Sequence, residues 1–515
     1  MTEAAIDACT PAGAERRGGE GLARACAVAG VGLALGFLTL AAPRLLNDPD
    51  TLWHVRVGSD IIASRSLPTV DAYSHTDAGS PWIAKEWLSQ ALYGGAHDLA
   101  GWTGVVCLAI AALVASFSVV HRAVARELAP LPAFAIAFWA FAMSSGAFLA
   151  RPHALALPVA LWFIDDVWRR ARDRAPPNVV SLAALCVWAN LHGSIAIGLA
   201  AVAFASAHAV IANSTMANAA MTGWSFSLAG VRDALLDERS RRWIAFAAAA
   251  PLAACIHPYG IEALRSTLVI AGSPAKEFIR EWRSFTIGGE PVMALHLLVA
   301  GFCLLTSRFR APVFAAAFAL ALLAMYLAHV RFACFLLLAT PIVLARDIAR
   351  AAPSLLRGAQ GDRPGDMVEA SLTRIGRGAA FAFAVVAAIA VATIAVVGPR
   401  PPARVYPLAA IDAARNAGVE GNVLNAYNFG GALLFEGVPT FLDGRTDRLF
   451  DEGRFFAEVM RNINSPAALD RYIETYDIGW TILPPGHPFD AMLEARPEWT
   501  RLYADDVAVV RQRTP

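Results

Sequence analysis

The chain is 515 residues long, 57% of its residues are hydrophobic, 17% are charged, and its formal net charge at pH 7 is +1. About a quarter of the residues of an average soluble protein are charged, so this composition excludes an ordinary soluble enzyme. The near-zero net charge lacks the basic excess typical of nucleic-acid binding, and we expect no nucleic-acid partner.

Eleven apolar blocks of about bilayer-spanning length predict an all-α polytopic membrane protein with the lipid bilayer around it. They lie at residues 25–45, 102–121, 131–150, 153–168, 178–192, 194–212, 243–257, 291–306, 312–330, 332–346 and 378–397. The fifth and sixth blocks are short and could be two helices or one span with a re-entrant turn. We assign residues 1–24 to an N-terminal tail, 25–397 to the transmembrane domain and 398–515 to a separate C-terminal domain.

Arginine placement in the loops predicts the orientation, because cytoplasmic loops carry an excess of basic residues. With the N-terminus inside, the cytoplasmic segments hold Arg16, Arg17, Arg24, Arg122, Arg126, Arg169, Arg170, Arg172, Arg174, Arg232, Arg239, Arg241, Arg242, Arg308, Arg310 and the arginine-rich stretch 346–377. An odd number of spans then places the C-terminal domain outside. The high content of arginine and alanine is typical of a GC-rich bacterial genome. We therefore predict a multi-pass protein of the bacterial inner membrane with a cytoplasmic N-terminus and a periplasmic C-terminal domain.

The C-terminal domain is predicted to be a small α/β fold, because short β-branched runs alternate with segments of helical spacing. Strands are expected at 423–427, 440–442, 479–483 and 507–511, and helices at 455–462 and 467–476. The pair Gly430 and Gly431 predicts a tight turn or bend after the first strand.

The first outer loop, residues 46–101, gathers most of the candidate chemistry of a chain that is otherwise poor in charge. Its ionisable side chains include Asp48, Asp50, His54, Asp71, Lys85 and Glu86. Two carboxylates separated by one residue, where a helix leaves the membrane, can converge on one metal ion or one reacting hydroxyl. Partial desolvation there would push their pKa values apart and suit one of them to act as a general base.

Each of these features also has a purely structural interpretation. Aspartates after an outgoing span are commonly solvated helix caps, and Glu86 could lie in the first turn of a helix, where an acid favours the dipole. Trp53, Trp82 and Trp87 offer flat faces for a sugar ring or a lipid, although tryptophan at a membrane interface is usually an anchor.

Residues 48–54, followed by Gly58, Pro68, Asp71 and the pair Glu86 and Trp87, resemble the first outer loop of bacterial GT-C superfamily proteins. These are polytopic glycosyltransferases that use polyprenyl-phosphate-linked sugars and are related in architecture to the catalytic subunits of oligosaccharyltransferases. The resemblance implies that Asp48 and Asp50 serve as a base or as ligands of a divalent metal such as Mg²⁺ or Mn²⁺.

Weaker similarity to a poorly characterised branch of this superfamily extends over much of the chain. It involves residues 188–193, 257–260, 281–282, 425–431 and 442–445. The tail lacks the Trp-Trp-Asp-Tyr-Gly type motif with which oligosaccharyltransferases hold an acceptor sequon, which puts a peptide acceptor in doubt.

Polar groups at the outer membrane edge form a second set of candidates, because such groups are costly there and tend to line cavities. They are Arg151, His153, Asn190, His192, His257, Tyr259, His329 and Arg331. An arginine here could bind the phosphate of a lipid-linked donor or could simply cap a helix or snorkel. In the tail, Asp443 and Arg445 follow a short predicted strand and belong either to a ligand-contacting loop or to a turn.

These observations favour a membrane glycosyltransferase that moves a sugar from a polyprenyl-phosphate donor to a glycan or lipid-linked acceptor of the cell envelope. Asp48 or Asp50 would be catalytic, Arg331 would hold phosphate, and Trp53, Trp82 and His54 would shape the sugar pocket. The remaining candidate substrate-binding residues are Asp71, Glu86, Arg151, His192, His257, Asp443 and Arg445. The alternative is a non-catalytic transporter or assembly factor for cell-surface polysaccharide, although ionisable groups cluster at one face rather than at span midpoints.

Overall fold

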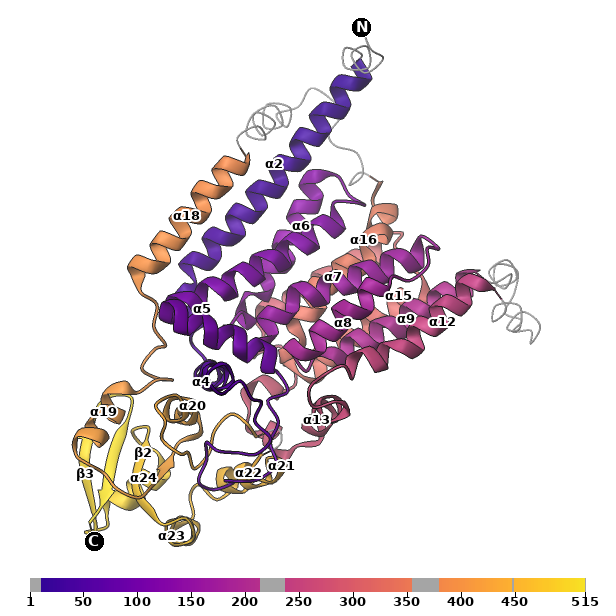
Figure 1. Cartoon of the computed structure of the whole chain (residues 1–515). Coiled ribbons are helices and arrows are strands. Elements are labelled where there is room, and N and C mark those ends of the chain that lie inside the picture. The colour runs from indigo at the N-terminus through magenta and orange to yellow at the C-terminus, as the bar shows by residue number, and fades with distance from the viewer. Residues whose placement is uncertain (1–10, 214–236, 354–378, 447–448, 515) are drawn as a thin grey trace.

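The computed structural model describes residues 11–213, 237–353, 379–446 and 449–514. Figure 1 shows a bundle of long helices with a smaller α/β part at one end. The bundle consists of α2 (Pro11–Leu40), α5 (Trp87–Val124), α6 (Pro130–Met143), α7 (Pro152–Arg172), α8 (Val179–Leu191), α9 (Ile195–Asn213), α12 (Glu238–Ala254), α14 (Pro291–Thr306), α15 (Val313–Ala328), α16 (Ala333–Ala351) and α18 (Ala379–Val397).

Each of the eleven predicted spans overlaps one of these helices. Among the described residues, five segments are apolar and long enough to cross a membrane, and they are Leu22–Leu40, Trp87–Val124, Pro130–Ala147, Ile195–Ala212 and Val330–Ala351. Four shorter apolar helices accompany them. The structure therefore supports a membrane protein, while the number of crossing helices and the orientation stay predictions. The two short blocks are separate helices, α8 and α9, joined through residues 192–194.

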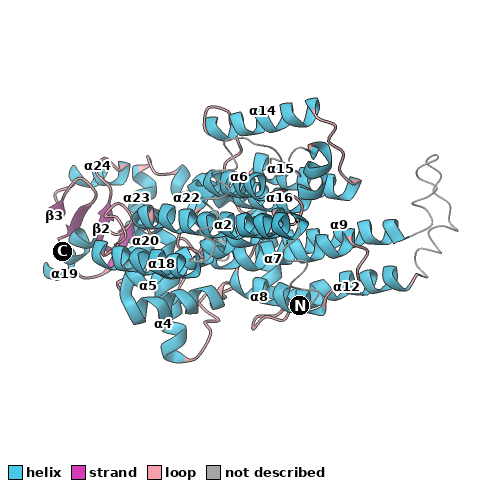
Figure 2. Cartoon of the chain, turned by 90° about the horizontal axis from the view of Figure 1, so that it is seen from above, coloured by secondary structure: helices cyan, strands magenta, loops and turns pink. Residues whose placement is uncertain are grey.

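The outer surface of the bundle is apolar where it has no protein neighbour. Seen from above, α14 lies at the edge of the bundle (Figure 2). Its large apolar side chains Leu298, Phe302 and Leu305 are 69%, 67% and 88% exposed. Such a continuous exposed apolar face would be a liability in water but is the normal surface of a helix in lipid.

Shorter helices lie between the long helices along the chain. They are α3 (Ala42–Leu45), α4 (Pro49–Ser64), η1 (Ser144–Ala147), α13 (Ile261–Gly272), η2 (Pro274–Glu277), η3 (Arg280–Trp282) and η4 (Val330–Phe332). Helix α4 begins directly after Asp48, whose carboxylate accepts a hydrogen bond from the Asp50 amide at 2.8 Å. This N-cap, with Pro49 at the first helical position, turns the chain out of the bundle and onto its end.

The C-terminal part contains a four-stranded sheet in the order β1-β2-β4-β3. Strands β1 (Asn422–Asn425) and β2 (Ile478–Leu483) are parallel, whereas β4 (Val509–Arg513) is antiparallel to β2 and to β3 (Trp499–Ala504). The helices of this part are α19 (Leu408–Asn416), α20 (Tyr427–Phe435), α21 (Leu449–Glu452), α22 (Arg454–Arg461), α23 (Pro466–Thr475) and α24 (Pro488–Glu494). Three predicted strands and both predicted helices are thus present.

Two expectations about the tail are wrong. Residues 440–442 form no strand and make only an isolated bridge between Thr440 and Ser74. Gly430 and Gly431 lie inside α20 rather than in a turn. A Cβ atom at Gly430 would lie 2.2 Å from the Leu442 carbonyl oxygen, and one at Gly431 would lie 2.1 Å from the Pro49 carbonyl oxygen. The two glycines therefore allow close helix packing, which a local pattern cannot distinguish from a bend.

Candidate functional site

A compact ion cluster lies where α4 meets the end of the bundle that faces the α/β part. The Arg151 guanidinium is at its centre, with Nη2 2.7 Å from Asp50 Oδ2 and Nη1 3.3 Å from Asp48 Oδ2. The same Nη1 is 3.0 Å from Glu281 Oε2. Arg331 continues the chain of charges, because its Nη1 lies 3.3 Å from Glu281 Oε1. The two aspartates of the acidic motif are thus joined to both predicted arginines.

Four separate elements bring this cluster together. Asp48 caps α4, Asp50 lies in its first turn, and Arg151 precedes the proline that starts α7. Glu281 lies in η3 and Arg331 in η4, two short 3₁₀ turns that pack against each other. The Arg331 guanidinium carbon is 4.3 Å from the centre of the Trp282 ring, a cation–π contact that orients the side chain.

Burial sets the protonation of the acids. Desolvation raises the pKa of Asp50 to about 7, against the lowering effect of Arg151, and the neighbouring Asp48 and Glu281 charges raise it further. Desolvation likewise raises the pKa of Asp48. Burial also acts to raise the pKa of Glu281, but Arg151 and Arg331 outweigh it and lower that pKa to about 2. Asp50 is therefore an acid whose charge changes near neutral pH.

A histidine and glutamate group adjoins the ion cluster. Glu86 Oε2 is 3.7 Å from His54 Nε2, and Glu86 Oε1 is 3.4 Å from His192 Nε2. Burial lowers the pKa of His54 well below its usual value, so this imidazole is neutral, and its Nδ1 is 3.2 Å from the Gln90 amide nitrogen. His257 lies beside this group, with Nε2 2.9 Å from the Lys85 carbonyl oxygen.

A small pocket lies next to Glu86, whose Oε1 is 3.5 Å from the Gly193 amide in its lining. Its lining is mostly apolar and consists of Lys85, Ala189, Gly193, Ile195, Ala254, Ala263, Leu264 and Thr267. It lies between α8, α9, α12 and α13, close to the ionic groups.

The remaining predicted residues form a second, fully buried cluster. Arg445 Nη1 is 2.5 Å from Asp71 Oδ1, and Arg445 Nη2 is 2.7 Å from Asp443 Oδ2. The side chains of all three residues are 0% exposed. The guanidinium carbon lies 4.9 Å from the Trp82 ring centre and 5.1 Å from that of Tyr73. Asp71, Trp82, Asp443 and Arg445 therefore contact one another, and they tie the first outer loop to the C-terminal part.

The two clusters are neighbours through Gly444. A Cβ atom at this position would lie 2.0 Å from Asp50 Oδ1 and 2.8 Å from Trp53 Nε1. Trp53 Nε1 donates a hydrogen bond to Asp50 Oδ1 at 3.0 Å, and its ring centre is 3.6 Å from that of His54. The loop held by Arg445 therefore covers the Asp50 carboxylate.

Three functional candidates were not selected from the sequence. Glu281 and Trp282 belong to a segment with weak superfamily similarity and no predicted role, and Gly444 lies in the middle of a predicted turn. The sequence contains one indication, a charged and an aromatic residue side by side in a charge-poor chain. Their partners, Arg151 and Arg331, lie far away in the sequence, next to α7 and in η4. Within the described ranges, no group of three or more His, Cys, Asp or Glu side chains is suited to a metal ion.

No family model and no curated protein matches the sequence. The apo oligosaccharyltransferase of Archaeoglobus fulgidus resembles this chain with a TM-score of 0.50 at 12% identity, over 87% of this chain and 69% of that one. The ArnT protein of Cupriavidus metallidurans bound to undecaprenyl phosphate gives a TM-score of 0.41 at 14% identity, over 93% and 97% of the two chains. The similarity to the oligosaccharyltransferase confirms the predicted GT-C-like architecture at the level of the fold.

Proposed function

We propose that this protein is a membrane glycosyltransferase that transfers a sugar from a polyprenyl-phosphate donor to a glycan or lipid-linked acceptor at the periplasmic face. The observation that carries the proposal is the buried pair Asp48 and Asp50 bridged by Arg151, at the end of an apolar bundle. It combines a carboxyl group whose pKa is about 7 with cations next to a partly apolar cavity.

In the proposed step, the Asp50 carboxylate takes the proton of the acceptor hydroxyl as that oxygen attacks the anomeric carbon of the donor sugar. The bond between the anomeric carbon and the phosphate oxygen breaks, and polyprenyl phosphate leaves with the electron pair. A base with a pKa near 7 is well matched to this task, because it is ionised in part and still basic.

Arg331 is proposed to bind the leaving phosphate. Its ion pair with Glu281 uses Nη1, and a guanidinium has five N–H donors, so Arg331 can bind a phosphate while it keeps Glu281. Arg151 is placed to hold Asp48 and Asp50 in position, because it contacts both. Trp53 and His54 adjoin Asp50 and are proposed to contact the sugar, with Glu86 and His192 behind them.

The buried cluster of Arg445 is proposed to act indirectly. Trp82 and Asp71 face Arg445 rather than Asp50, so their contribution would be to hold the covering loop in place. His257 is proposed to position Lys85 and Glu86 through the Lys85 carbonyl group.

The predicted divalent metal does not fit the side chains as they lie. Each of the four carboxylate oxygens of Asp48 and Asp50 already accepts a hydrogen bond, from the Asp50 amide, Trp53 Nε1 and two Arg151 nitrogens. A metal ion would have to displace Arg151, whose positive charge occupies the position between the two acids. We therefore derive no step through a metal.

The test is a comparison of surface glycans in a host that carries Asp50→Asn, a full deletion or the control Asp60→Asn. Asp60 lies on the same helix and pairs with Arg56, so its substitution changes one carboxylate outside the cluster. We expect Asp50→Asn to lose the same glycan as the deletion at an unchanged membrane level, and Asp60→Asn to keep it. If only the deletion changes the glycan, the protein is a transporter or an assembly factor instead.

A further inference from the structure

Tyr427 is the first residue of α20 and lies where the α/β part meets the ion cluster around Arg151. Gly431 follows one helical turn later, so the two residues share one face of α20. A Cβ atom at Gly431 would lie 2.1 Å from the carbonyl oxygen of Pro49, the residue between the two aspartates of the acidic motif. The face of α20 that carries Tyr427 is therefore the face that packs on the first turn of α4, next to which α20 lies in Figure 1.

The charges of the ion cluster act on the Tyr427 hydroxyl group. Desolvation by the surrounding protein raises the pKa of Tyr427 well above its usual value. The negative charges of Asp50 and Glu281 raise it further, against the lowering effect of Arg151. The phenol therefore keeps its proton near neutral pH, and Tyr427 supplies an uncharged hydrogen-bond donor beside the proposed base.

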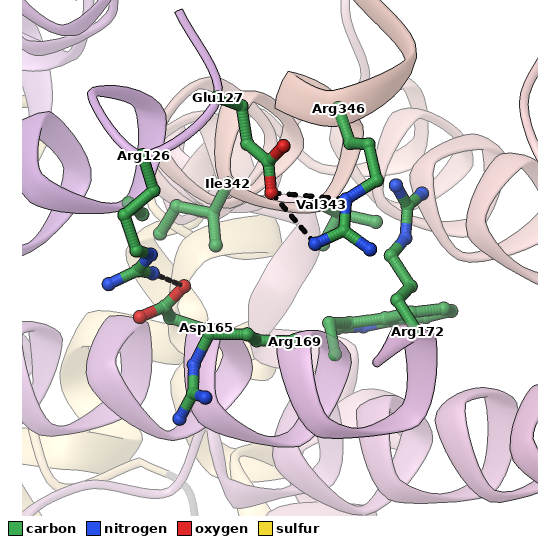
Figure 3. Close-up of a pocket in the computed structure, with 10 residues that line it drawn as sticks. Arg126, Glu127, Asp165, Arg169, Arg172, Ile342, Val343 and Arg346 are labelled. Atoms are coloured by element: carbon green, nitrogen blue, oxygen red, sulfur yellow. Dashed lines mark hydrogen bonds and ion pairs between the residues drawn. The ribbon is translucent and has the colours of Figure 1, made fainter. Parts of the chain in front are cut away.

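The Tyr427 hydroxyl has no hydrogen-bond partner among the described residues, and the side chain keeps some exposed surface. Near the C-terminal ends of α5 and α16, by contrast, charged groups pair with one another, as Arg346 does with Glu127 at 2.9 Å (Figure 3). The Tyr427 ring is held by Phe456, whose ring centre is 4.5 Å away. A tyrosine hydroxyl in a protein usually finds a partner, so a hydroxyl that is fixed by its ring and left unpaired is suited to a ligand oxygen.

The part of the chain that supplies Tyr427 indicates which substrate it contacts. Arg331, the proposed ligand of the donor phosphate, belongs to η4 between two helices of the apolar bundle. Tyr427 belongs to the α/β part, which lies beyond the end of the bundle in Figure 1. A lipid-linked donor approaches the site from the bundle, so the α/β part is left to contact the acceptor.

We propose that Tyr427 is an acceptor-binding residue that donates a hydrogen bond to a hydroxyl oxygen of the acceptor glycan, next to the hydroxyl that reacts. The inference rests on the proposed glycosyl transfer and adds to it that the α/β part supplies one side of the acceptor site. Tyr427 takes no part in the proton transfer, because Asp50 receives the proton of the reacting hydroxyl.

The test compares Tyr427→Phe with the wild type as purified full chains in neutral detergent. The donor probe is the lipid extract of wild-type membranes, and the acceptor probe is the glycan fraction of the deletion host, which lacks the transferred sugar. The KM for the acceptor probe should rise about three- to tenfold, the loss of one hydrogen bond. The kcat and the KM for the donor probe should stay within about twofold, because binding is lost equally before and during the reaction.

Tyr476→Phe is the matched control. Tyr476 is also a partly exposed tyrosine of the α/β part, and its hydroxyl likewise has no hydrogen-bond partner in the described ranges. Its ring packs against Phe455, with ring centres 5.6 Å apart, and the charges that act on it include Glu458 and Arg471 but not Asp50. Its KM for the acceptor probe should stay within about twofold of the wild type.

Unchanged thermal unfolding of Tyr427→Phe is expected, because the hydroxyl that it removes has no protein partner. A less stable variant would mean that the hydroxyl serves the fold, which overturns the inference. So do an equal KM for the acceptor probe in Tyr427→Phe and Tyr476→Phe, and a rise in the KM for the donor probe instead. Failure of the proposed function has a different signature: Asp50→Asn then keeps the surface glycan in the host, and the inference falls with it.

Discussion

Asp50 carries the proposed chemistry, and the pH dependence of the reaction follows from its surroundings. Burial raises the pKa of Asp50 to about 7, and only the carboxylate form can act as a base. The rate at low acceptor concentration should fall about tenfold per pH unit below 7 and become constant above about 8. Asp50→Asn should lower the rate by about 10²–10⁴-fold. Initial rates measured from pH 5.5 to 9 would contradict this assignment if they are flat.

Asp50 affects the stability of the fold in the opposite direction: the rate rises with pH, whereas the contribution of Asp50 to the free energy of unfolding falls with pH. Between about pH 4 and 7 the folded chain keeps a proton on Asp50 that the unfolded chain has released. The contribution of Asp50 to the free energy of unfolding is therefore largest at low pH and falls as the pH rises to 7. Asp50→Asn removes this dependence and should make the protein more stable at pH 8.

The negative charge of Glu281 raises the pKa of Asp50, in addition to the larger effect of burial. It also competes with Asp50 for Arg151. Glu281→Gln should therefore move the midpoint of the pH–rate profile to lower pH. Glu277→Gln, which removes an exposed acid paired with Arg461, should leave the midpoint in place. An unmoved midpoint in Glu281→Gln would mean that this residue does not influence the base.

At the scale of the elements, the packing of α20 against α4 positions Asp50. A Cβ atom at Gly431 would lie 2.1 Å from the Pro49 carbonyl oxygen, so Gly431→Ala must push the two helices apart. Overpacking of this kind costs about 1–3 kcal/mol of stability. A displacement of about 1 Å at a reacting group can lower a rate by about 10²-fold. We expect a larger loss of activity than of protein level, as judged by rate per folded molecule.

Gly288→Ala is the matched control for this prediction, because its Cβ atom would meet nothing within 4 Å. It should retain wild-type activity and stability. If Gly431→Ala behaves like Gly288→Ala, the backbone adapts at α20 without moving Asp50, and the packing does not set the geometry of the site.

The elements that could be predicted from the sequence are those with a local signature. Apolar length predicted a helix at each proposed span, and the closely spaced pair Asp48 and Asp50 predicted an acidic centre at the start of α4. The partners of this centre could not be predicted, because Arg151 and Glu281 join it from α7 and η3 through tertiary contacts. For the same reason, Gly431 was assigned to a bend, since only the position of Pro49 reveals its role.

At the scale of the whole molecule, Arg445 links the two parts of the chain. It bridges Asp71 of the first outer loop, 374 residues away along the chain, and Asp443 of the C-terminal part, two residues away. The Arg445 and Asp71 side chains have no exposed surface. Removal of one partner from a buried ion pair costs about 3–5 kcal/mol, because a buried charge is left without compensation. In Arg445→Met, two carboxylates lose their common cation, so the interface between the parts should loosen before the bundle unfolds.

Limited proteolysis measures this difference directly. Arg445→Met should be cut within residues 398–446 at a protease concentration that leaves the wild type intact, while the helical bundle stays protected. Arg471→Met removes an exposed arginine that pairs with Glu458 and should change stability by less than about 1 kcal/mol. If Arg445→Met is cut no faster than Arg471→Met, the two parts are held together by their apolar contacts. The glycosyl-transfer rate distinguishes loosening of the loop at Gly444 from cleavage of the chain. A loosened loop should uncover Asp50 and lower the rate even in molecules that remain uncut.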